Sequence, residues 1–336
     1  MRIKVRTVLC PILTILLFQV SLPTMVQAVE APVKLIFDTD IGPDCDDAGA
    51  AAVLHALADQ GEVEILAMMV STGGETAKWG PPCLDAINTF YGRPDIPIGV
   101  IRKKGAEDTS KYNEQLAKEF PNDLQHGDRA DEATQLYRKV LSSQPDGSVV
   151  IVSVGYLSNL RHLLESKGDE HSELNGIELV KQKVKTYVCM GGTFPKGREW
   201  NIHRDTIASK QVAENWPTSI YFSGFEIGNE IHTGNNLKDK TPTKNPVRRA
   251  YQLYTGGKDR QSWDQTAVLF AIRGLNGKLK DFWELSAAGR LVLAEDGANT
   301  WDSASGKHRY LIKKKPPSQI AAEIEALMLL PPKSKK

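Results

Sequence analysis

Short runs rich in β-forming residues alternate with helical patterns along this chain, and this alternation constrains the fold more than any other feature. The predicted strands are Val33–Phe37, Val63–Val70, Ile96–Ile101, Ser148–Val154, Lys185–Met190 and Ser219–Phe222. The helices predicted between them are Asp46–Asp59, Pro82–Tyr91, Glu132–Ser142, Leu157–Ser166 and Asp205–Trp216. Because alternation of this kind implies right-handed crossovers, the sequence predicts an α/β fold: a single domain with an open, Rossmann-like, mostly parallel sheet and helices on both faces.

The last third of the chain continues with helices and a pair of strands. Helices are predicted at Pro246–Tyr254 and Asp264–Gly274, and a strand pair at Leu291–Ala294 and Tyr310–Ile312. A final helix is predicted at Pro317–Leu330, followed by a disordered, lysine-rich tail over residues 331–336. The predicted domain therefore spans residues 29–330.

The first 28 residues have the pattern of a secretory signal peptide. Arg2, Lys4 and Arg6 precede an uncharged stretch, and Val26-Gln27-Ala28 offers a small-residue cleavage site. The apolar stretch is too short to span a bilayer. We therefore expect the mature chain to begin near Val29 and to be exported to the periplasm or the extracellular space.

Charge and cysteine content exclude some classes of partner. Removal of the predicted signal peptide changes the formal net charge from +1 to −2, which argues against nucleic acid as a partner. No later apolar run is long enough for a membrane span, and a homo-oligomer is compatible with the sequence. Cys45, Cys83 and Cys189 would remain, and their apolar surroundings predict buried free thiols, with a Cys45–Cys83 bridge as the alternative.

Aspartates crowd the junction between the first predicted strand and the first helix. The five residues are Asp38, Asp40, Asp44, Asp46 and Asp47. Helix capping would explain Asp46 and Asp47 but not Asp38 and Asp40. Open α/β sheets bind ligands at the carboxyl ends of their strands, and a divalent cation would relieve the repulsion between these carboxylates. Oxygen-only ligands favour Ca²⁺ or Mg²⁺ over zinc.

Polar and glycine-containing segments also follow the other predicted strands. They are Ser71–Glu75, Val154–Leu160 and Met190–Gly192, joined later in the chain by Glu199–Asn201 and Ser262–Asp264. Glycine after a strand lets the backbone approach a ligand closely. Because the segments follow consecutive strands, we expect them to form the rim of one pocket.

In this order, these segments resemble the nucleoside hydrolase superfamily, the inosine–uridine-preferring N-ribohydrolases. Asp38–Ala48 resembles the opening Asp-x-Asp-x-Gly…Asp-Asp-Ala signature, and Val154–Leu160 resembles the Gly-x-Leu-Thr-Asn loop. Met190–Gly192 with Glu199–Asn201 is similar to the Met-Gly-Gly…Glu-Phe-Asn segment, and Asp264 to the late metal-binding aspartate. The likeness extends over about residues 33–312.

The resemblance implies a Ca²⁺ site and a general base. Asp40, Asp47 and Asp264 would be ligands, together with the main-chain carbonyl of Val154. The ribose 2′- and 3′-hydroxyls and one water would complete the coordination shell. Asp40 would be the general base toward that water.

The resemblance also implies the substrate contacts. Asp38 and Asp46 would orient neighbours or hold sugar hydroxyls, while Glu199 and Asn201 would grip the ribose above Met190. Three further candidates depend on departures from the family pattern or on a nearby loop. Trp263 would stack on the base, Trp79 is a candidate for its other face, and Glu75 for a contact that many members make with Asn.

The implied activity is calcium-dependent hydrolysis of the N-glycosidic bond of ribonucleosides, with purines preferred, to ribose and free base. Carboxylates around the sugar suit the positive charge of an oxocarbenium-like transition state. Export would suit purine salvage from external nucleosides.

Departures from the family pattern keep alternatives open. Pro43-Asp44-Cys45 makes the opening loop two residues longer than the compact signature, which leaves open whether Asp44 or Asp46 faces the sugar. Trp263 stands where some members have a histidine acid, and Gly73-Gly74-Glu75 stands where many have an asparagine. Because this histidine and asparagine are missing, a nucleoside- or sugar-binding protein of the same fold without catalysis is the main alternative. A phosphatase of the haloacid-dehalogenase type is disfavoured, because Gly42 stands where that class has threonine.

Overall fold

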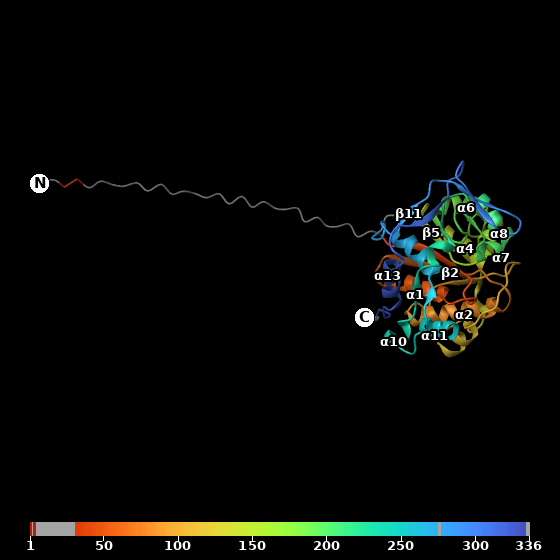
Figure 1. Ribbon diagram of the computed structural model, residues 1–336, viewed down its shortest axis with the longest axis horizontal. Coiled ribbons are helices and arrows are strands. Elements are labelled where there is room, and N and C mark those ends of the chain that lie inside the picture. The colour runs from red at the N-terminus through yellow and green to blue at the C-terminus, as the bar shows by residue number, and fades with distance from the viewer. Residues whose placement is uncertain (2, 5–30, 275–276, 334–336) are drawn as a thin grey trace. The chain divides into compact units, whose positions relative to one another are not determined.

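A nine-stranded sheet forms the centre of the computed structural model, which describes residues 1, 3–4, 31–274 and 277–333 (Figure 1). In spatial order its strands are β11 (Trp283–Leu285), β14 (Arg309–Lys313), β8 (Ile220–Ser223), β6 (Val184–Met190), β5 (Val149–Ser153), β1 (Val33–Thr39), β2 (Val63–Val70), β3 (Ile98–Val100) and β4 (Asp131–Glu132). Every neighbouring pair is parallel except β11 with β14. The predicted mostly parallel sheet is thus confirmed.

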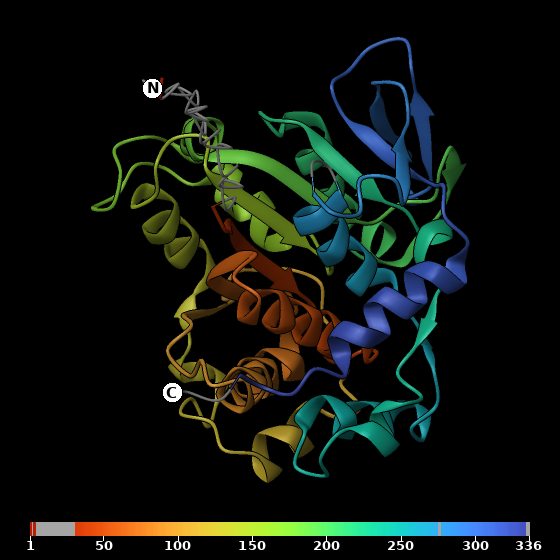
Figure 2. The same ribbon diagram turned by 90° about the vertical axis from the view of Figure 1, so that its left-hand side faces the viewer.

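Helices surround this sheet. They are α1 (Asp46–Asp59), α2 (Gly74–Phe90), α3 (Asn113–Glu119), α4 (Ala133–Ser142), α5 (Ser158–Glu165), α6 (Gly176–Lys183), α7 (Trp200–Arg204), α8 (Thr206–Asn215), α9 (Phe225–Gly228), α10 (Leu237–Lys240), α11 (Pro246–Thr255), α12 (Trp263–Leu269) and α13 (Pro317–Met328). A 3-10 turn, η1, spans Gly127–Arg129, and a π-helical segment, η2 (Phe270–Gly274), continues α12. The C-terminal α13 lies beside α1 (Figure 2).

The central strands are buried on both faces, because each face packs against its own apolar core. In β1, Leu35 and Phe37 belong to one core and Ile36 to the other. The first core includes side chains of α1, α12 and α13, and the second includes side chains of α4, α5 and α8. This double burial explains why these strands are continuous apolar runs rather than alternating ones.

The strand order reverses direction between β1 and β5. From β1 the chain adds β2, β3 and β4 on one side, and it then returns to place β5, β6, β8 and β14 on the other. Ligands of open α/β sheets bind beyond the carboxyl ends of the strands at such a switch point. The aspartates that follow β1 and the loop that follows β5 therefore meet where a site is expected.

The predicted strand pair near the C-terminus is wrong in its pairing. Residues 291–293 lie in β12 (Arg290–Leu293), which pairs with β13 (Asn299–Asp302), and β13 pairs with β7 (Lys196–Gly197) in a separate sheet. Tyr310–Ile312 instead lies in β14 of the main sheet. The intervening turn contains Gly297 with φ of 80°, so a local hairpin forms. A second small sheet pairs β9 (His232–Thr233) with β10 (Arg260–Gln261).

Helix α2 begins earlier than predicted. It starts at Gly74 and continues through Pro81 and Pro82, whereas the predicted helix begins only at Pro82. Its second half, from Cys83 to Asn88, is buried, so packing outweighs the cost of two prolines inside the helix. Trp79 therefore lies on a helix rather than on a loop.

Several predictions concern the ends of the chain and the thiols. Most of the predicted signal peptide and residues 334–336 of the predicted tail lie outside the described residues, and one compact unit begins at Pro32. No helix in the described part is long and apolar enough to cross a membrane. Cys45, Cys83 and Cys189 are buried and free, as predicted.

The buried His55 on α1 gives the first testable prediction. Its Nε2 lies 2.8 Å from Asn88 Oδ1, its ring stacks on Tyr91, and burial lowers its pKa from 6.5 to about 3. Below the ordinary pKa the unfolded chain binds a proton that the folded chain does not, so stability falls as the pH drops from 6.5 towards 3. The slope is about 1.4 kcal/mol per pH unit.

Denaturant unfolding of wild type and His55→Gln at a series of pH values checks this. The wild type should lose about 2.7 kcal/mol more than the variant over two pH units below the ordinary pKa. Parallel pH profiles would contradict a neutral buried His55.

Candidate active site

A cavity of about 410 Å³ opens at the carboxyl ends of the central strands. Its lining residues are Asp40, Pro43, Asp44, Asp46, Asp108, Thr109, Lys111, Val154, Met190, Glu199, Trp200, Asn201, Phe225, Tyr254, Arg260, Trp263 and Asp264. They come from the segments that follow β1, β3, β5, β6 and β8 and from α11, β10 and α12. The expected single pocket rim is therefore confirmed for four of the five segments, but Ser71–Glu75 does not line the cavity among the described residues.

Carboxylates from distant parts of the chain meet on the floor of the cavity. Asp40 follows β1, Asp46 opens α1, and Asp264 lies in the first turn of α12. The backbone N–H of Asp264 donates to Asp46 Oδ2 at 3.2 Å. Gly49 permits this approach, because a Cβ there would lie 2.4 Å from the side chain of Gln265 on α12.

The loop after β5 closes on the same floor. A Cβ at Gly155 would lie 2.3 Å from the backbone nitrogen of Asp40, so only glycine allows this contact. The neighbouring carbonyl of Val154 accepts a hydrogen bond from Asn201 Nδ2 at 2.9 Å. A carbonyl oxygen has two lone pairs, so Val154 keeps one for a second partner.

Four aspartates of the site are buried close to other carboxylates. Burial raises the pKa of Asp40, Asp46, Asp47 and Asp264 well above the ordinary value, and neighbouring carboxylates raise it further. Asp44 contributes to this repulsion in all four cases. Such a group favours either protonation or a bound cation.

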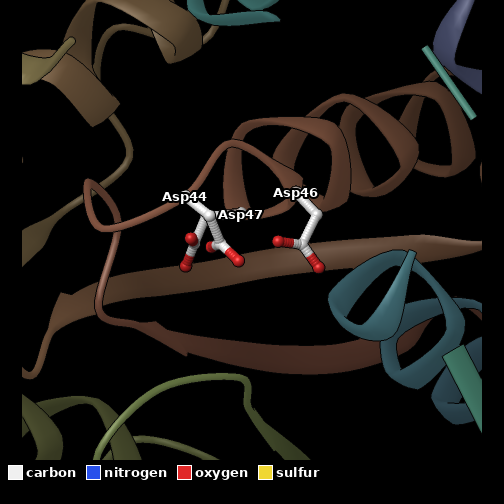
Figure 3. Close-up of side chains that lie close together, drawn as sticks. All are labelled: Asp44, Asp46 and Asp47. Carbon is white, nitrogen blue, oxygen red and sulfur yellow. The ribbon is translucent and has the colours of Figure 1, made fainter. Parts of the chain in front are cut away.

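The donor set fits a hard divalent cation. Asp44, Asp46 and Asp47 each offer a carboxylate oxygen within 4.8 Å of the others (Figure 3). Asp47 Oδ1 accepts from the hydroxyl of Thr39, whereas its buried Oδ2 has no hydrogen-bond partner in the described part of the chain. This cluster thus contains one predicted ligand, Asp47, together with Asp44 and Asp46. Asp40, another predicted ligand, lies on the cavity floor.

The predicted sugar-gripping residues form another part of the lining. Glu199 caps α7 by accepting the N–H groups of Asn201 and Ile202, and it also accepts the N–H of Gly192 at 3.1 Å. Burial raises its pKa to about 7, against the opposing effect of these hydrogen bonds. Met190 and Asn201 lie beside it on the cavity wall, and the Asn201 amide is 3.3 Å from the Met190 sulfur.

Three predicted substrate contacts do not line the cavity that the described residues form. Asp38 is fully buried behind the floor, where it accepts from Tyr137 at 2.8 Å and from Asn159 at 3.2 Å. Glu75 is exposed in the first turn of α2. Trp79 packs edge-on against His126 instead. Asp38 therefore fits the orienting role, and neither Glu75 nor Trp79 contacts the space where a sugar would sit.

Trp263 lines the cavity, as predicted, but it already has close neighbours. Its ring stacks on Phe225 at 5.3 Å, and its Nε1 donates to the Phe225 carbonyl at 2.9 Å. The Arg260 guanidinium lies 4.9 Å from the indole centroid. Arg260, Tyr254 and Phe225 were not predicted from the sequence, since no local pattern marks them.

Asp108 is another lining residue that the sequence did not reveal. It accepts from the Tyr156 hydroxyl at 2.7 Å, and the Trp200 indole donates to that hydroxyl at 3.2 Å. Thr76 donates to the Asp108 carbonyl at 2.9 Å. The loop between β3 and α3 is thereby attached to two neighbouring segments, and its carboxylate is held at the wall.

The chain belongs to the inosine-uridine preferring nucleoside hydrolase family, whose model matches residues 35–325. This membership supports a hydrolase that acts on nucleosides. Comparison with curated proteins gives no match.

Solved structures share the fold at low sequence identity. An inosine-uridine preferring nucleoside hydrolase from Bacillus anthracis has a TM-score of 0.67 and 15% identity, covering 88% of this chain and 99% of that one. An inosine-guanosine nucleoside hydrolase has a TM-score of 0.66 and 19% identity, covering 88% and 98%. The type III effector XopQ, solved with adenosine diphosphate ribose, has a TM-score of 0.65 and 12% identity, covering 90% and 93%.

Proposed function

We propose that this protein hydrolyses the N-glycosidic bond of ribonucleosides in a calcium-dependent reaction, with Asp40 as general base. The observation that carries the proposal is the group of buried carboxylates of Asp40, Asp47 and Asp264, which form no ion pair in the described part of the chain, next to a wall formed by Glu199 and Asn201. Carboxylates facing a ribosyl ring stabilise the positive charge that develops when the bond to the base breaks.

Asp40, Asp47, Asp264 and the Val154 carbonyl would hold the ion, and Asp44 or Asp46 would complete or support this set. Calcium, when bound, would supply positive charge for the sugar diol and lower the pKa of a nearby water. Asp38 stays behind the floor and fixes the end of β1 through Tyr137.

Asp40 accepts a proton from the attacking water as the water oxygen bonds to C1′ of the ribose. Asp40 is 6% exposed and lines the cavity, so it can reach a water on the floor. Glu199 and Asn201 hold the sugar hydroxyls, while Met190 packs against the ring.

A substrate panel tests the proposal directly. The purified protein is incubated with inosine, guanosine, adenosine and uridine, each with calcium and with a chelator, and the release of reducing sugar is measured. Calcium-dependent release of ribose is expected. Tight nucleoside binding without sugar release would favour a binding protein of the same fold, and turnover of a phosphomonoester would favour a phosphatase.

Purine preference is proposed on the basis of Trp263, which lines the cavity and directly precedes the proposed ligand Asp264 in the sequence. Aromatic stacking on a base contributes about 1–3 kcal/mol, or roughly ten- to a hundredfold in rate. Trp263→Ala should lower kcat/KM for inosine by that factor and affect uridine less. Trp79→Ala is the matched control, because that indole does not line the cavity among the described residues. Equal losses on both nucleosides, or a wild type that prefers uridine, would limit Trp263 to packing.

A further inference from the structure

Cationic and aromatic side chains alternate along one wall of the cavity, which we name the Arg260 wall: Lys111, Tyr254, Arg260 and Trp263. The Lys111 ammonium lies 4.3 Å from the Tyr254 ring centroid. The Arg260 guanidinium lies 5.3 Å from the same ring and 4.9 Å from that of Trp263. These are the cations of a lining that otherwise carries the carboxylates Asp40, Asp44, Asp46, Asp108, Glu199 and Asp264. Positive charge is therefore confined to one side of the cavity.

Arg260 is held in place but keeps donors for a ligand. Its Nη2 donates to Asp44 Oδ2 at 2.8 Å, and its Nη1 donates to Gln261 Oε1 at 3.1 Å. Each terminal nitrogen of a guanidinium has two N–H groups, so one on each is left for a further acceptor. The side chain is 25% exposed, which matches a group that faces the cavity.

The longer opening loop supplies the anchor for this guanidinium. Asp44 belongs to the Pro43-Asp44-Cys45 segment, which lengthens that loop, and it pairs with Arg260 across 216 residues of sequence. The Asp44–Arg260 pair lies next to Trp263, and Trp263 occupies the position at which some relatives have a histidine acid. The longer opening loop and the replacement of the histidine by Trp263 are thus parts of one structural feature.

We propose that Arg260 determines base specificity: it donates to the departing base and stabilises negative charge there, which favours oxopurines over adenine. This inference rests on the proposed function. A ribose bound by the floor carboxylates directs its base past Asp264 to Trp263 and therefore to Arg260. A guanidinium at that point repels a protonated base and attracts a base that carries carbonyl oxygens.

The chemical step balances without an acid on the base. The C1′–N bond breaks, and its electron pair stays on the base, where the ring carbonyl of hypoxanthine or xanthine shares the charge. The water oxygen bonds to C1′, and its proton goes to Asp40. The base anion takes a proton from solvent as it leaves the cavity. Adenine has no ring carbonyl and gains less from Arg260.

The experiment compares leaving groups in Arg260→Gln and wild type. The substrates are inosine, xanthosine, adenosine and 4-nitrophenyl β-D-ribofuranoside, whose phenolate leaves without assistance. Loss of one donor to developing negative charge lowers kcat by about 10²–10³-fold, so this loss is expected on inosine and xanthosine. The loss on the nitrophenyl riboside should be less than about tenfold, and Arg260→Lys should recover part of the inosine rate.

Arg249→Gln is the matched control, because Arg249 forms a similar pair with Glu119 at 2.8 Å on the surface and does not line the described cavity. Equal losses of Arg260→Gln on all four substrates would overturn the inference, as would a wild type that prefers adenosine. Sugar release by wild type, combined with an equal loss of rate on all four substrates in Arg260→Gln, refutes this inference but not the proposed function. No sugar release by wild type from any of the four substrates refutes the proposed function itself.

Discussion

Asp40→Asn is expected to lower kcat on ribonucleosides by about 10²–10⁴-fold, since general-base catalysis contributes that much. The side chain keeps its shape but can no longer accept the proton of the attacking water. Because Asp40 also stands among the proposed ligands, calcium content is measured on the same samples. A large rate loss at full calcium occupancy identifies the base.

The matched control is Asp239→Asn, which changes an exposed aspartate on α10 in the same way. It should keep the wild-type rate and calcium content. Near-normal turnover by Asp40→Asn would exclude the base assignment, whereas rate loss in step with calcium loss would leave Asp40 as a ligand only.

Removal of calcium is expected to abolish activity and to lower the melting temperature. The buried carboxylates of Asp40, Asp46, Asp47 and Asp264 would then repel one another without the charge of the ion. A ligand present at about 100 times its Kd stabilises the folded state by about 2.7 kcal/mol, and this contribution is lost with the ion. Re-addition of calcium should restore both quantities.

The destabilisation caused by calcium removal should also depend on pH. Burial raises the folded-state pKa of these four carboxylates, so their protonated forms fit the calcium-free site. Stability of the calcium-free protein is therefore lost as the pH rises through the raised pKa values. Scanning calorimetry with and without chelator should show a larger penalty at about pH 8 than at about pH 5.5. An equal decrease in melting temperature on chelation at both pH values would rule out a cation bound by these buried carboxylates.

Local patterns in the sequence predicted the central strands and the carboxylate cluster closely. Strand β2 and helix α1 have the predicted bounds, because a continuous apolar run and a helix with acidic residues in its first turn are local signals. The predicted C-terminal strand pairing failed, since β12 and β14 are both short apolar runs that do not specify a partner, and only tertiary packing selects one.

For the site, the sequence by itself determined which carboxylates follow β1 and that a polar rim would form at the strand ends. Both follow from the order of strands and helices, which fixes the strand ends that share an edge. Tertiary structure alone decided the rest. Asp38 is buried beneath the cavity floor and hydrogen-bonded to Tyr137, and Arg260 donates to Asp44. Trp79 and Glu75 lie outside the lining of the described cavity. Such contacts join side chains far apart along the chain, and no local pattern encodes them.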